Sequence, residues 1–181
     1  MSADDRLRWD RHHDALPYPT VRDVGLPLPF RPFADLFPRH GTALDLACGR
    51  GTAAVWLARR GLSVQAHDVS TVAVATARAL AHSCGCAARC TVAVTDLDDG
   101  LPPGDPVDVL LCNGFRDPSL YEPMLQRLAG GGLLALGVLS EVGAGAGRFR
   151  APAGELPRAF AALSVIGSGE ADGRAWLLAR R

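Results

Sequence analysis

A glycine-rich turn at residues 43–52, with the sequence Ala-Leu-Asp-Leu-Ala-Cys-Gly-Arg-Gly-Thr, is the segment best suited to binding chemistry. An apolar run contains Asp45, and Gly49 and Gly51 stand directly before an alanine-rich segment. Glycine lets the backbone approach a ligand closely, and the first turn of a helix presents N–H groups that lack a partner within the helix. The segment therefore predicts a turn that binds a nucleotide-type ligand.

Taken alone, this turn is compatible with two kinds of cofactor, because Gly49-x-Gly51-x-x-Ala54 also fits a dinucleotide-binding fingerprint. Two further acids narrow the choice. Asp68 ends a second apolar run, where a carboxylate can accept both hydroxyls of a ribose. Asp96 ends a third run, where it or the backbone of Leu97 can receive an adenine amino group.

Short apolar runs alternate with helical segments from residue 42 onward, which is typical of an α/β fold with a parallel sheet. We predict a Rossmann-like, seven-stranded, mostly parallel sheet with a C-terminal antiparallel hairpin and helices on both faces. The three acids then meet at the carboxyl edge, where such sheets bind ligands. The predicted strands are 42–47, 62–68, 90–96, 107–113, 133–140, 164–170 and 174–181; the predicted helices are 51–61, 70–83, 117–129 and 154–163.

Residues 1–40 differ in composition from the rest and form a predicted lid or wrap on a domain at 41–181. Prolines at positions 17, 19, 27, 29, 32 and 38 exclude a continuous helix or a central strand. We expect short helical pieces, one of them at 33–37, joined by extended segments.

Charge and hydropathy exclude several classes of partner. Acidic and basic residues number 19 each, so no net charge attracts nucleic acid or an anionic membrane. The N-terminus lacks the apolar core of a signal peptide, and no run approaches the ~18 apolar residues of a membrane span. We expect a cytoplasmic protein that acts on neither nucleic acid nor membrane.

The five cysteines fit a reducing compartment, because an odd number gives no complete disulfide framework. Cys84, Cys86 and Cys90 follow His82 closely in the sequence. A structural zinc site, however, needs four ligands, and its cysteines usually have two or more residues between them. We predict small packed or loop cysteines and no metal.

Together these motifs resemble the class I S-adenosylmethionine-dependent methyltransferases over residues 42–181. The segment Ala43–Gly51 is similar to the family's first motif, with Ala47 where glycine is commonest. The resemblance implies S-adenosylmethionine as cofactor. It implies that the methionine end lies at Asp45 and at Ala47, Cys48, Gly49 and Gly51, the ribose at Asp68 and Val69, the adenine at Asp96 and Leu97, and the sulfonium beside Cys112 and Asn113.

Within that family, the opening Trp-Asp-Arg-His-His and the segment 140–160 are similar to the small tellurite-resistance-type and thiopurine-type methyltransferases. In those proteins the first segment covers the cofactor, which implies a cofactor contact for Trp9. An aromatic face also interacts favourably with a cationic sulfonium. His13 stands where the resemblance leads us to expect a tyrosine.

Residues for the methyl acceptor and for catalysis are less strongly indicated. Arg116 and Arg148 are candidates for an anionic acceptor, and Tyr18 and Asn113 are further substrate candidates. For Arg116 the alternative is an exposed ion pair with Asp117, which would cap the next helix. If the acceptor needs a general base, the candidates are His12, His13 and Glu141.

The sequence leaves the methyl acceptor and the oligomeric state open. The reading it favours is methyl transfer to a small molecule by in-line displacement, with S-adenosylhomocysteine leaving. A nicotinamide-dependent oxidoreductase is the first alternative, and it leaves Asp45 and Asp96 without a role. The second alternative is a noncatalytic protein that keeps the cofactor-binding fold.

Overall fold

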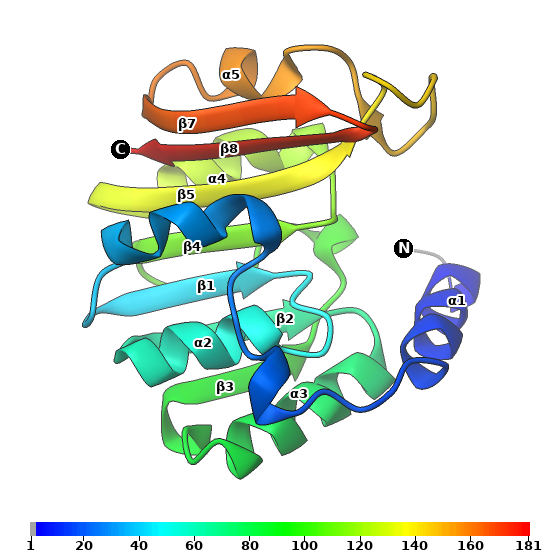
Figure 1. The fold of residues 1–181 in the computed structure, drawn as a ribbon, viewed down its shortest axis with the longest axis vertical. Coiled ribbons are helices and arrows are strands. Elements are labelled where there is room, and N and C mark those ends of the chain that lie inside the picture. The colour runs from blue at the N-terminus through cyan, green and yellow to red at the C-terminus, as the bar shows by residue number, and fades with distance from the viewer. Residues whose placement is uncertain (1–2) are drawn as a thin grey trace. The chain divides into compact units, whose positions relative to one another are not determined.

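The computed structural model describes residues 3–181, with side chains from residue 6 onward. The chain divides after Pro103 into two compact units, and each is described by itself. Both contain β-strands and helices (Figure 1).

The first unit contains three strands, three α-helices and four short 3-10 helices among its described residues. Its strands β1, β2 and β3 pair in parallel, in the order β3-β2-β1. In chain order the elements are α1 (Ala3–Asp14), η1 (Val21–Asp23), η2 (Leu28–Leu36), β1 (Thr42–Leu46), α2 (Thr52–Arg60), β2 (Ser63–Asp68), α3 (Thr71–Ser83), η3 (Ala87–Arg89), β3 (Cys90–Val94) and η4 (Leu97–Asp99).

Local signals in the sequence explain where α2 and α3 begin and end. The Ser70 side chain accepts a hydrogen bond from the Ala73 N–H at the start of α3, as predicted. Gly61 ends α2 in the left-handed conformation with φ +114°, which glycine adopts without steric cost. The strands and helices predicted for this unit are therefore confirmed to within a few residues.

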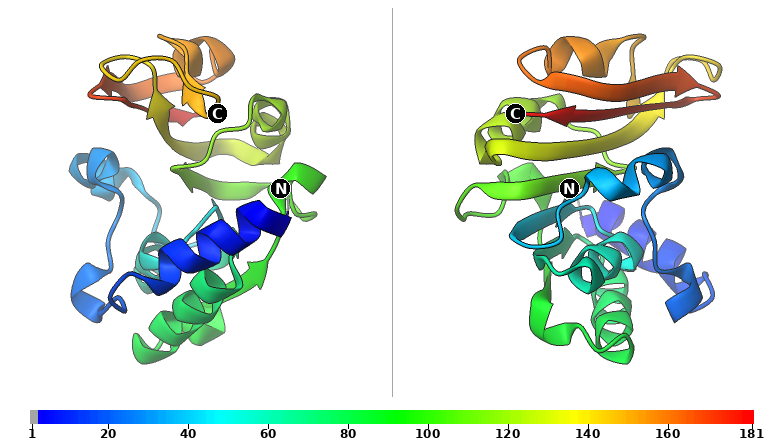
Figure 2. Two further views of the ribbon diagram at one scale, coloured as in Figure 1. Left: turned by 90° about the vertical axis from the view of Figure 1, so that its right-hand side faces the viewer. Right: turned by 60° about the vertical axis from the view of Figure 1, so that its left-hand side comes forward.

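The N-terminal segment has the broken structure that its prolines predict. Helix α1 lies against α3, as both views in Figure 2 show. The helix expected at 33–37 is part of the longer 3-10 helix η2, in which Phe30 is fully buried.

The second unit contains β4 (Val107–Asn113), η5 (Pro118–Leu120), α4 (Tyr121–Arg127), β5 (Leu128–Ser140), β6 (Arg150–Ala151), α5 (Glu155–Ala159), β7 (Ser164–Ala171) and β8 (Arg174–Arg180). Strand β4 pairs with β5 in parallel, whereas β8 pairs antiparallel with both β5 and β7. The predicted C-terminal hairpin is thus confirmed. Its turn residues Asp172 and Gly173 both have positive φ.

Two predicted helices of the second unit are too long. The helix predicted at 117–129 is the 3-10 turn η5 followed by α4, which ends at Arg127. The glycines at 130–132 belong to β5, because the Gly131 N–H donates to the Arg181 carbonyl and the Arg181 N–H donates to the Gly132 carbonyl. The helix predicted at 154–163 ends at Ala159, and the short strand β6 was not predicted.

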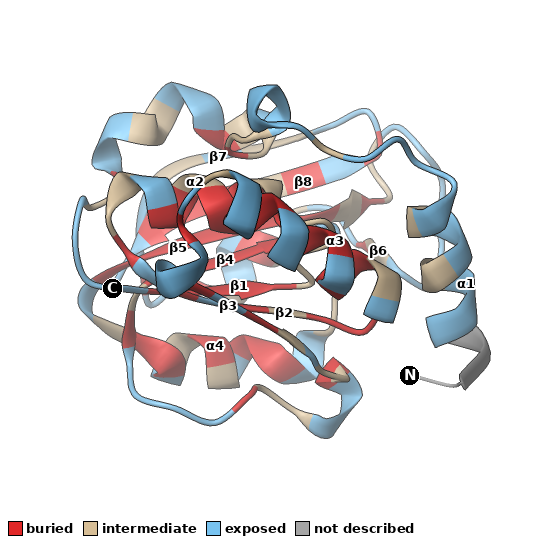
Figure 3. Ribbon diagram, turned by 90° about the horizontal axis from the view of Figure 1, so that it is seen from below, coloured by how far each residue is buried: buried red, intermediate tan, exposed pale blue. Residues whose placement is uncertain are grey.

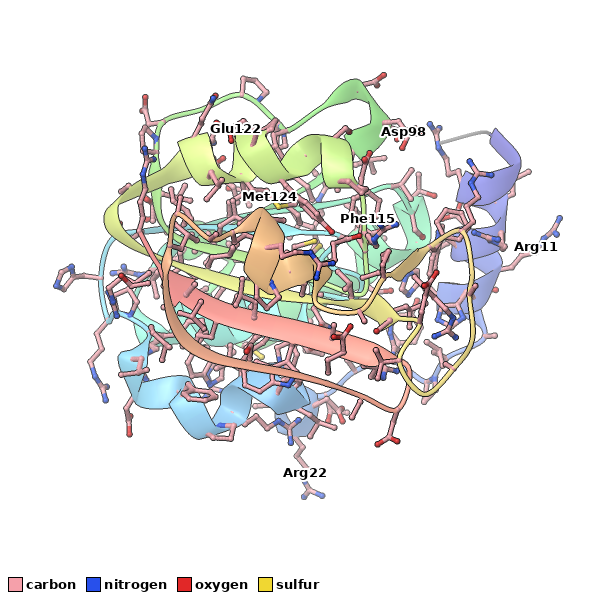
Figure 4. The ribbon with its side chains drawn as sticks, turned by 90° about the horizontal axis from the view of Figure 1, so that it is seen from above. Arg11, Arg22, Asp98, Phe115, Glu122 and Met124 are labelled. Carbon is pink, nitrogen blue, oxygen red and sulfur yellow. The ribbon has the colours of Figure 1, made fainter. Side chains whose placement is uncertain are left out.

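The buried side chains lie mainly on strands and on the helix faces that cover them (Figure 3). Helix α1 is mostly exposed, and the Arg11 side chain on it points away from the rest of its unit (Figure 4). In the described part of the chain, no helix has the length and apolar character that crossing a membrane requires.

Candidate functional site

The glycine turn joins β1 to α2 through a series of left-handed residues. Gly49 and Gly51 have φ values of +53° and +79°, and Ala47 has φ +50° although it carries a side chain. A left-handed non-glycine residue is strained, which explains why glycine suits this place. The Cys48 N–H donates to the His67 carbonyl at 2.9 Å, which ties the turn to β2.

The two glycines of the turn have different neighbours. A methyl group on Gly51 would lie 2.6 Å from Cβ of Ala77, so this glycine permits the close packing of the turn on α3. A methyl group on Gly49 would lie 3.5 Å from Cε1 of His13, so the imidazole covers this part of the turn. Close backbone approach, predicted here for a ligand, thus serves helix packing at Gly51.

Asp45 is the most unusual polar residue of the first unit. It is 1% exposed, and neither carboxylate oxygen has a hydrogen-bond partner of normal geometry. Burial, and after it the negative charge of Asp68, raises the pKa of Asp45 to about 8, against a smaller opposing effect of the Ala54 N–H. A buried carboxyl group without partners is costly for the folded protein, so it marks a place where a cationic group would be stabilised.

Asp68 ends β2 as predicted and is also largely buried. Its carboxylate accepts hydrogen bonds from the Gly49 N–H at 2.8 Å and from the Ser70 N–H at 2.9 Å. The adjacent Val69 is buried as well. Asp68 therefore holds the glycine turn against the start of α3, while its contact with a ribose stays a prediction.

Asp96 follows β3 and lies at the start of the 3-10 helix η4. Its carboxylate accepts from the Asp98 N–H at 3.0 Å, and Leu97 is buried. Asp45 is the penultimate residue of β1, Asp68 ends β2 and Asp96 follows β3, so the three acids lie near the same edge of the parallel sheet of the first unit. The adenine contact of Asp96 and Leu97 is not tested by these bonds.

Trp9, His12 and His13 form an aromatic cluster on α1. The Trp9 and His13 rings are stacked, with centroids 6.0 Å apart, and His12 meets both of them edge-on. Nδ1 of His13 is buried without a hydrogen-bond partner. Burial is also the main reason that the pKa of His13 lies below its ordinary value, an effect that the charge of Asp68 opposes.

Asp10 is a site residue that the sequence analysis missed. Its Oδ1 accepts hydrogen bonds from Ser70 Oγ at 2.5 Å and from the Val72 N–H at 3.2 Å, and Thr71 Oγ1 also donates to this carboxylate. Although burial opposes it, these bonds lower the pKa of Asp10. Asp10 therefore caps α3 from another helix. In the sequence, nothing but its position next to Trp9 pointed to a role for this residue.

Tyr18, predicted to contact substrate, is 77% exposed. It borders a small pocket next to the glycine turn, where an Arg50 guanidinium nitrogen donates to the Pro17 carbonyl. The pocket is lined by His13, Asp14, Leu16, Tyr18, Arg50, Val72 and Thr76.

The remaining predicted site residues belong to the second unit. Cys112 on β4 is fully buried, and its thiol approaches the Phe115 carbonyl at 3.8 Å. Asn113, at the end of β4, is exposed and lies against Gly137, where any Cβ would collide with the Asn113 side chain. The predicted contacts of Cys112 and Asn113 with the sulfonium stay predictions.

Arg116 has a different partner from the one that the sequence suggests. Its guanidinium forms a two-pronged ion pair with Glu155, at 2.8 and 2.5 Å, and the Tyr121 hydroxyl donates to the same carboxylate at 2.6 Å. Hydrogen bonding to Arg116 is the main reason that the pKa of Glu155 is lowered. Asp117 instead caps η5 by accepting from the Ser119 N–H. Arg116 is thus part of a satisfied cluster rather than an open anion site.

Glu141 and Arg148 both lie in the loop between β5 and β6. The Glu141 N–H donates to the Ala151 carbonyl at 3.0 Å, so its backbone orients the loop. The Arg148 guanidinium lies 5.2 Å from the ring centre of its neighbour Phe149, which is half exposed. The catalytic role of Glu141 and the substrate role of Arg148 stay predictions.

The cysteines are unbridged, and Cys86 and Cys90 are buried. Burial raises the pKa of Cys90 to about 12, which makes its thiol a poor metal ligand. Within the described residues, no group of three or more histidine, cysteine or acidic side chains could hold a metal ion.

Comparison with known proteins agrees with this geometry. Residues 43–132, which include the glycine turn and the three acids, match the methyltransferase domain family. A search of curated proteins finds no match in sequence.

Several solved structures share the fold. TehB from Haemophilus influenzae superposes with a TM-score of 0.73 at 18% identity, over 86% of this chain and 62% of TehB. Geranyl diphosphate C-methyltransferase from Streptomyces coelicolor A3(2), solved with S-adenosyl-L-homocysteine, gives 0.69 at 13% identity over 99% of this chain and 98% of that enzyme. The [4+2]-cyclase SpnF gives 0.65 at 18% identity, over 81% and 76%.

These findings confirm the predicted Rossmann-like α/β fold and the predicted cofactor, S-adenosylmethionine. The chain spans only 62% of the length of TehB, and SpnF shows that the fold also serves another reaction. Residues 43–132 thus contain a methyltransferase domain, and the chain has the fold of S-adenosylmethionine-dependent methyltransferases.

Proposed function

We propose that the chain transfers the methyl group of S-adenosylmethionine to a small-molecule acceptor by in-line displacement. The bond between the methyl carbon and the sulfonium sulfur breaks as the bond to the acceptor forms, and S-adenosylhomocysteine leaves. The cofactor supplies an activated methyl group, so the protein contributes chiefly alignment and exclusion of water.

The buried carboxyl group of Asp45 is the observation that best supports cofactor binding. Its two unpartnered oxygens lie on β1 next to the turn, where the ammonium of a methionine moiety would neutralise them. The start of α2 adds a second attraction, because its N-cap residue Gly51 has no side chain to cap the first N–H groups. A ligand that carries both an ammonium and a carboxylate suits this pair of features.

The residues that would hold the rest of the cofactor follow the edge of the sheet in the first unit. Asp68 and Val69 would contact the ribose, and Asp96 and Leu97 would contact the adenine. Asp68 keeps a role in binding even though it accepts two backbone N–H groups, because each carboxylate oxygen can accept more than one hydrogen bond.

The small-molecule class of acceptor is supported by the balanced charge of the chain and by the nature of one structural relative. Nineteen acidic and nineteen basic residues give no general attraction for nucleic acid. Geranyl diphosphate C-methyltransferase, similar over nearly its full length, acts on a small molecule. A thiolate, selenide or carboxylate acceptor needs no general base, whereas an alcohol does.

The test combines cofactor binding with turnover. Isothermal titration should show binding of S-adenosylmethionine and S-adenosylhomocysteine, and mass spectrometry should detect S-adenosylhomocysteine that accumulates only with an acceptor from a panel of thiols, carboxylates, alcohols and amines. The variant Arg11→Gln is a suitable control, because its side chain points into solvent (Figure 4). Binding of a nicotinamide cofactor, with no response to S-adenosylhomocysteine, would overturn the proposal.

A further inference from the structure

The imidazole of His13 lies over the glycine turn, where its Cε1 would be 3.5 Å from a Cβ on Gly49. Cε1 is the ring carbon bonded to both nitrogens, so the part of the ring nearest to this position lies between Nδ1 and Nε2. Trp9 covers one face of the ring in a stacked arrangement, and Nδ1 is buried without a partner. A polar ring atom that is shielded from water and unpaired lacks the hydrogen bond that a buried group requires.

Three features at or beside the glycine turn, one of them this ring, have complementary requirements. Asp45 offers two buried oxygens without a hydrogen-bond partner of normal geometry, although the Ala54 N–H in the first turn of α2 acts on them weakly, and these oxygens suit an ammonium. The nine-residue helix α2 begins at Thr52, directly after the turn, with no side chain capping its first N–H groups from Gly51. A helix N-terminus and an imidazole N–H both favour a carboxylate. The ammonium and the carboxylate of one amino-acid group would satisfy all three features together.

We propose that His13 binds the carboxylate at the methionine end of the cofactor through Nδ1–H, together with the N-terminus of α2. This inference rests on the proposed function and assigns His13 to cofactor binding instead of proton abstraction. Asp10 is the positioning residue, because its hydrogen bonds to Ser70 and Val72 hold α1 where His13 covers Gly49.

The assignment also separates the two adjacent histidines. His12 is exposed and meets its neighbours edge-on, whereas His13 is partly buried against the turn. The groups that face His13 are Asp68 from β2, Arg50 from the turn, and Asp10 and His12 from its own helix. Arg50 is the other cation near the turn, and its guanidinium is already bonded to the Pro17 carbonyl.

The experiment compares two ligands that differ only in the methionine portion. S-adenosylhomocysteine carries the amino-acid group, and 5′-methylthioadenosine lacks it. For His13→Ala, isothermal titration should show about 10- to 100-fold weaker binding of S-adenosylhomocysteine, the loss expected for a hydrogen bond to a charged group. Binding of 5′-methylthioadenosine should change less than about twofold. Arg11→Gln should leave both affinities unchanged.

A second variant guards against a purely structural effect. In His13→Asn the amide nitrogen takes roughly the place of Nδ1, so this variant should regain part of the affinity that His13→Ala loses. An equal loss for both ligands, or unchanged binding of S-adenosylhomocysteine by His13→Ala, would overturn the inference. So would a variant Arg50→Gln that loses more affinity than His13→Ala. If the wild-type protein bound no S-adenosylhomocysteine at all, the proposed function itself would fail.

Discussion

Two carboxylates in this chain, the buried Asp45 and the partly buried Glu155, are in opposite hydrogen-bonding states. Glu155 in the second unit accepts from Arg116 through two bonds and from the Tyr121 hydroxyl through a third. Asp45 in the first unit has no partner of normal geometry for either oxygen. The pKa of Glu155 is accordingly lowered, chiefly by the Arg116 hydrogen bond, and the pKa of Asp45 is raised to about 8, chiefly by burial.

This difference distinguishes Glu155, which is paired within the fold, from Asp45, for which we propose a ligand. Removing one member of a satisfied cluster destabilises the fold, because it leaves the other members without partners. An unsatisfied carboxyl group is a cost that a ligand can relieve, which supports the proposed role of Asp45 in cofactor binding. The same contrast explains why Arg116, a sequence candidate for anion binding, has its guanidinium already engaged.

The largest effect is expected for Glu155→Gln. The substitution removes the negative charge that Arg116 and Tyr121 contact, and both groups stay largely buried. We expect the free energy of unfolding to fall by about 3 kcal/mol, as for other broken buried ion pairs. Urea unfolding monitored by circular dichroism measures this change. A loss below about 0.5 kcal/mol, the usual range of surface substitutions, would remove the contrast with Asp45.

The substitution Asp45→Asn should have the opposite effect on stability. At neutral pH the folded protein keeps Asp45 protonated, which costs up to about 1.4 kcal/mol for each unit by which the pH exceeds the ordinary pKa of 3.8, and asparagine avoids this cost. We expect the ligand-free protein to gain about 2 kcal/mol in unfolding free energy. Binding of S-adenosylhomocysteine should weaken about 10-fold or more, measured by titration. Destabilisation together with unchanged binding would show that Asp45 serves the fold alone.

The pH dependence of stability sharpens the same contrast. Because the pKa of Asp45 is higher in the folded state, its contribution to stability is present at low pH and is lost as the pH rises from about 4 to about 8. Because the pKa of Glu155 is lower in the folded state, its contribution is lost as the pH falls through that lowered pKa. Urea titrations of the wild type and both variants between pH 4 and pH 9 should show that only Asp45→Asn removes the loss of stability between about pH 4 and about pH 8.

The substitution Asp10→Asn should have a moderate effect. It weakens the bonds that cap α3 from α1, and caps of this kind contribute about 1 kcal/mol. Hydrogen exchange should become faster in α1 while the strands of the first unit keep their protection. Unchanged exchange in α1 would mean that Asp10 does not hold this helix in place.

The smallest effect, and one that stabilises, is expected for Ala47→Gly. Ala47 has φ +50°, and a left-handed alanine costs about 1 kcal/mol relative to glycine. We expect a gain of about 0.5 kcal/mol after the greater flexibility of glycine in the unfolded state is counted. Thermal unfolding should show a small rise in Tm, and a fall would mean that the Ala47 methyl group makes contacts that outweigh the strain.

Elements with strong local signals were predicted well. Helix α3 begins after Ser70 and ends at Ser83, as predicted. Its start was predictable because a serine side chain can accept a hydrogen bond from the first turn of a helix. The helix predicted at 117–129 was too long, because the backbone of Gly131 and Gly132 bonds to Arg181 at the other end of the second unit. A partner 50 residues away in sequence leaves no trace in the local pattern.

For the candidate site, the sequence alone determined the residue types and their order: a glycine turn, an acid on each of three strands or just after it, and the family they indicate. Only the tertiary structure decided which polar groups are satisfied. It pairs Arg116 with Glu155, uses Asp10 to cap α3, and leaves Asp45 and Nδ1 of His13 unpaired. Burial and hydrogen bonding depend on segments far apart in the chain, so the difference between a paired and an unpaired carboxylate emerges only when the chain is folded.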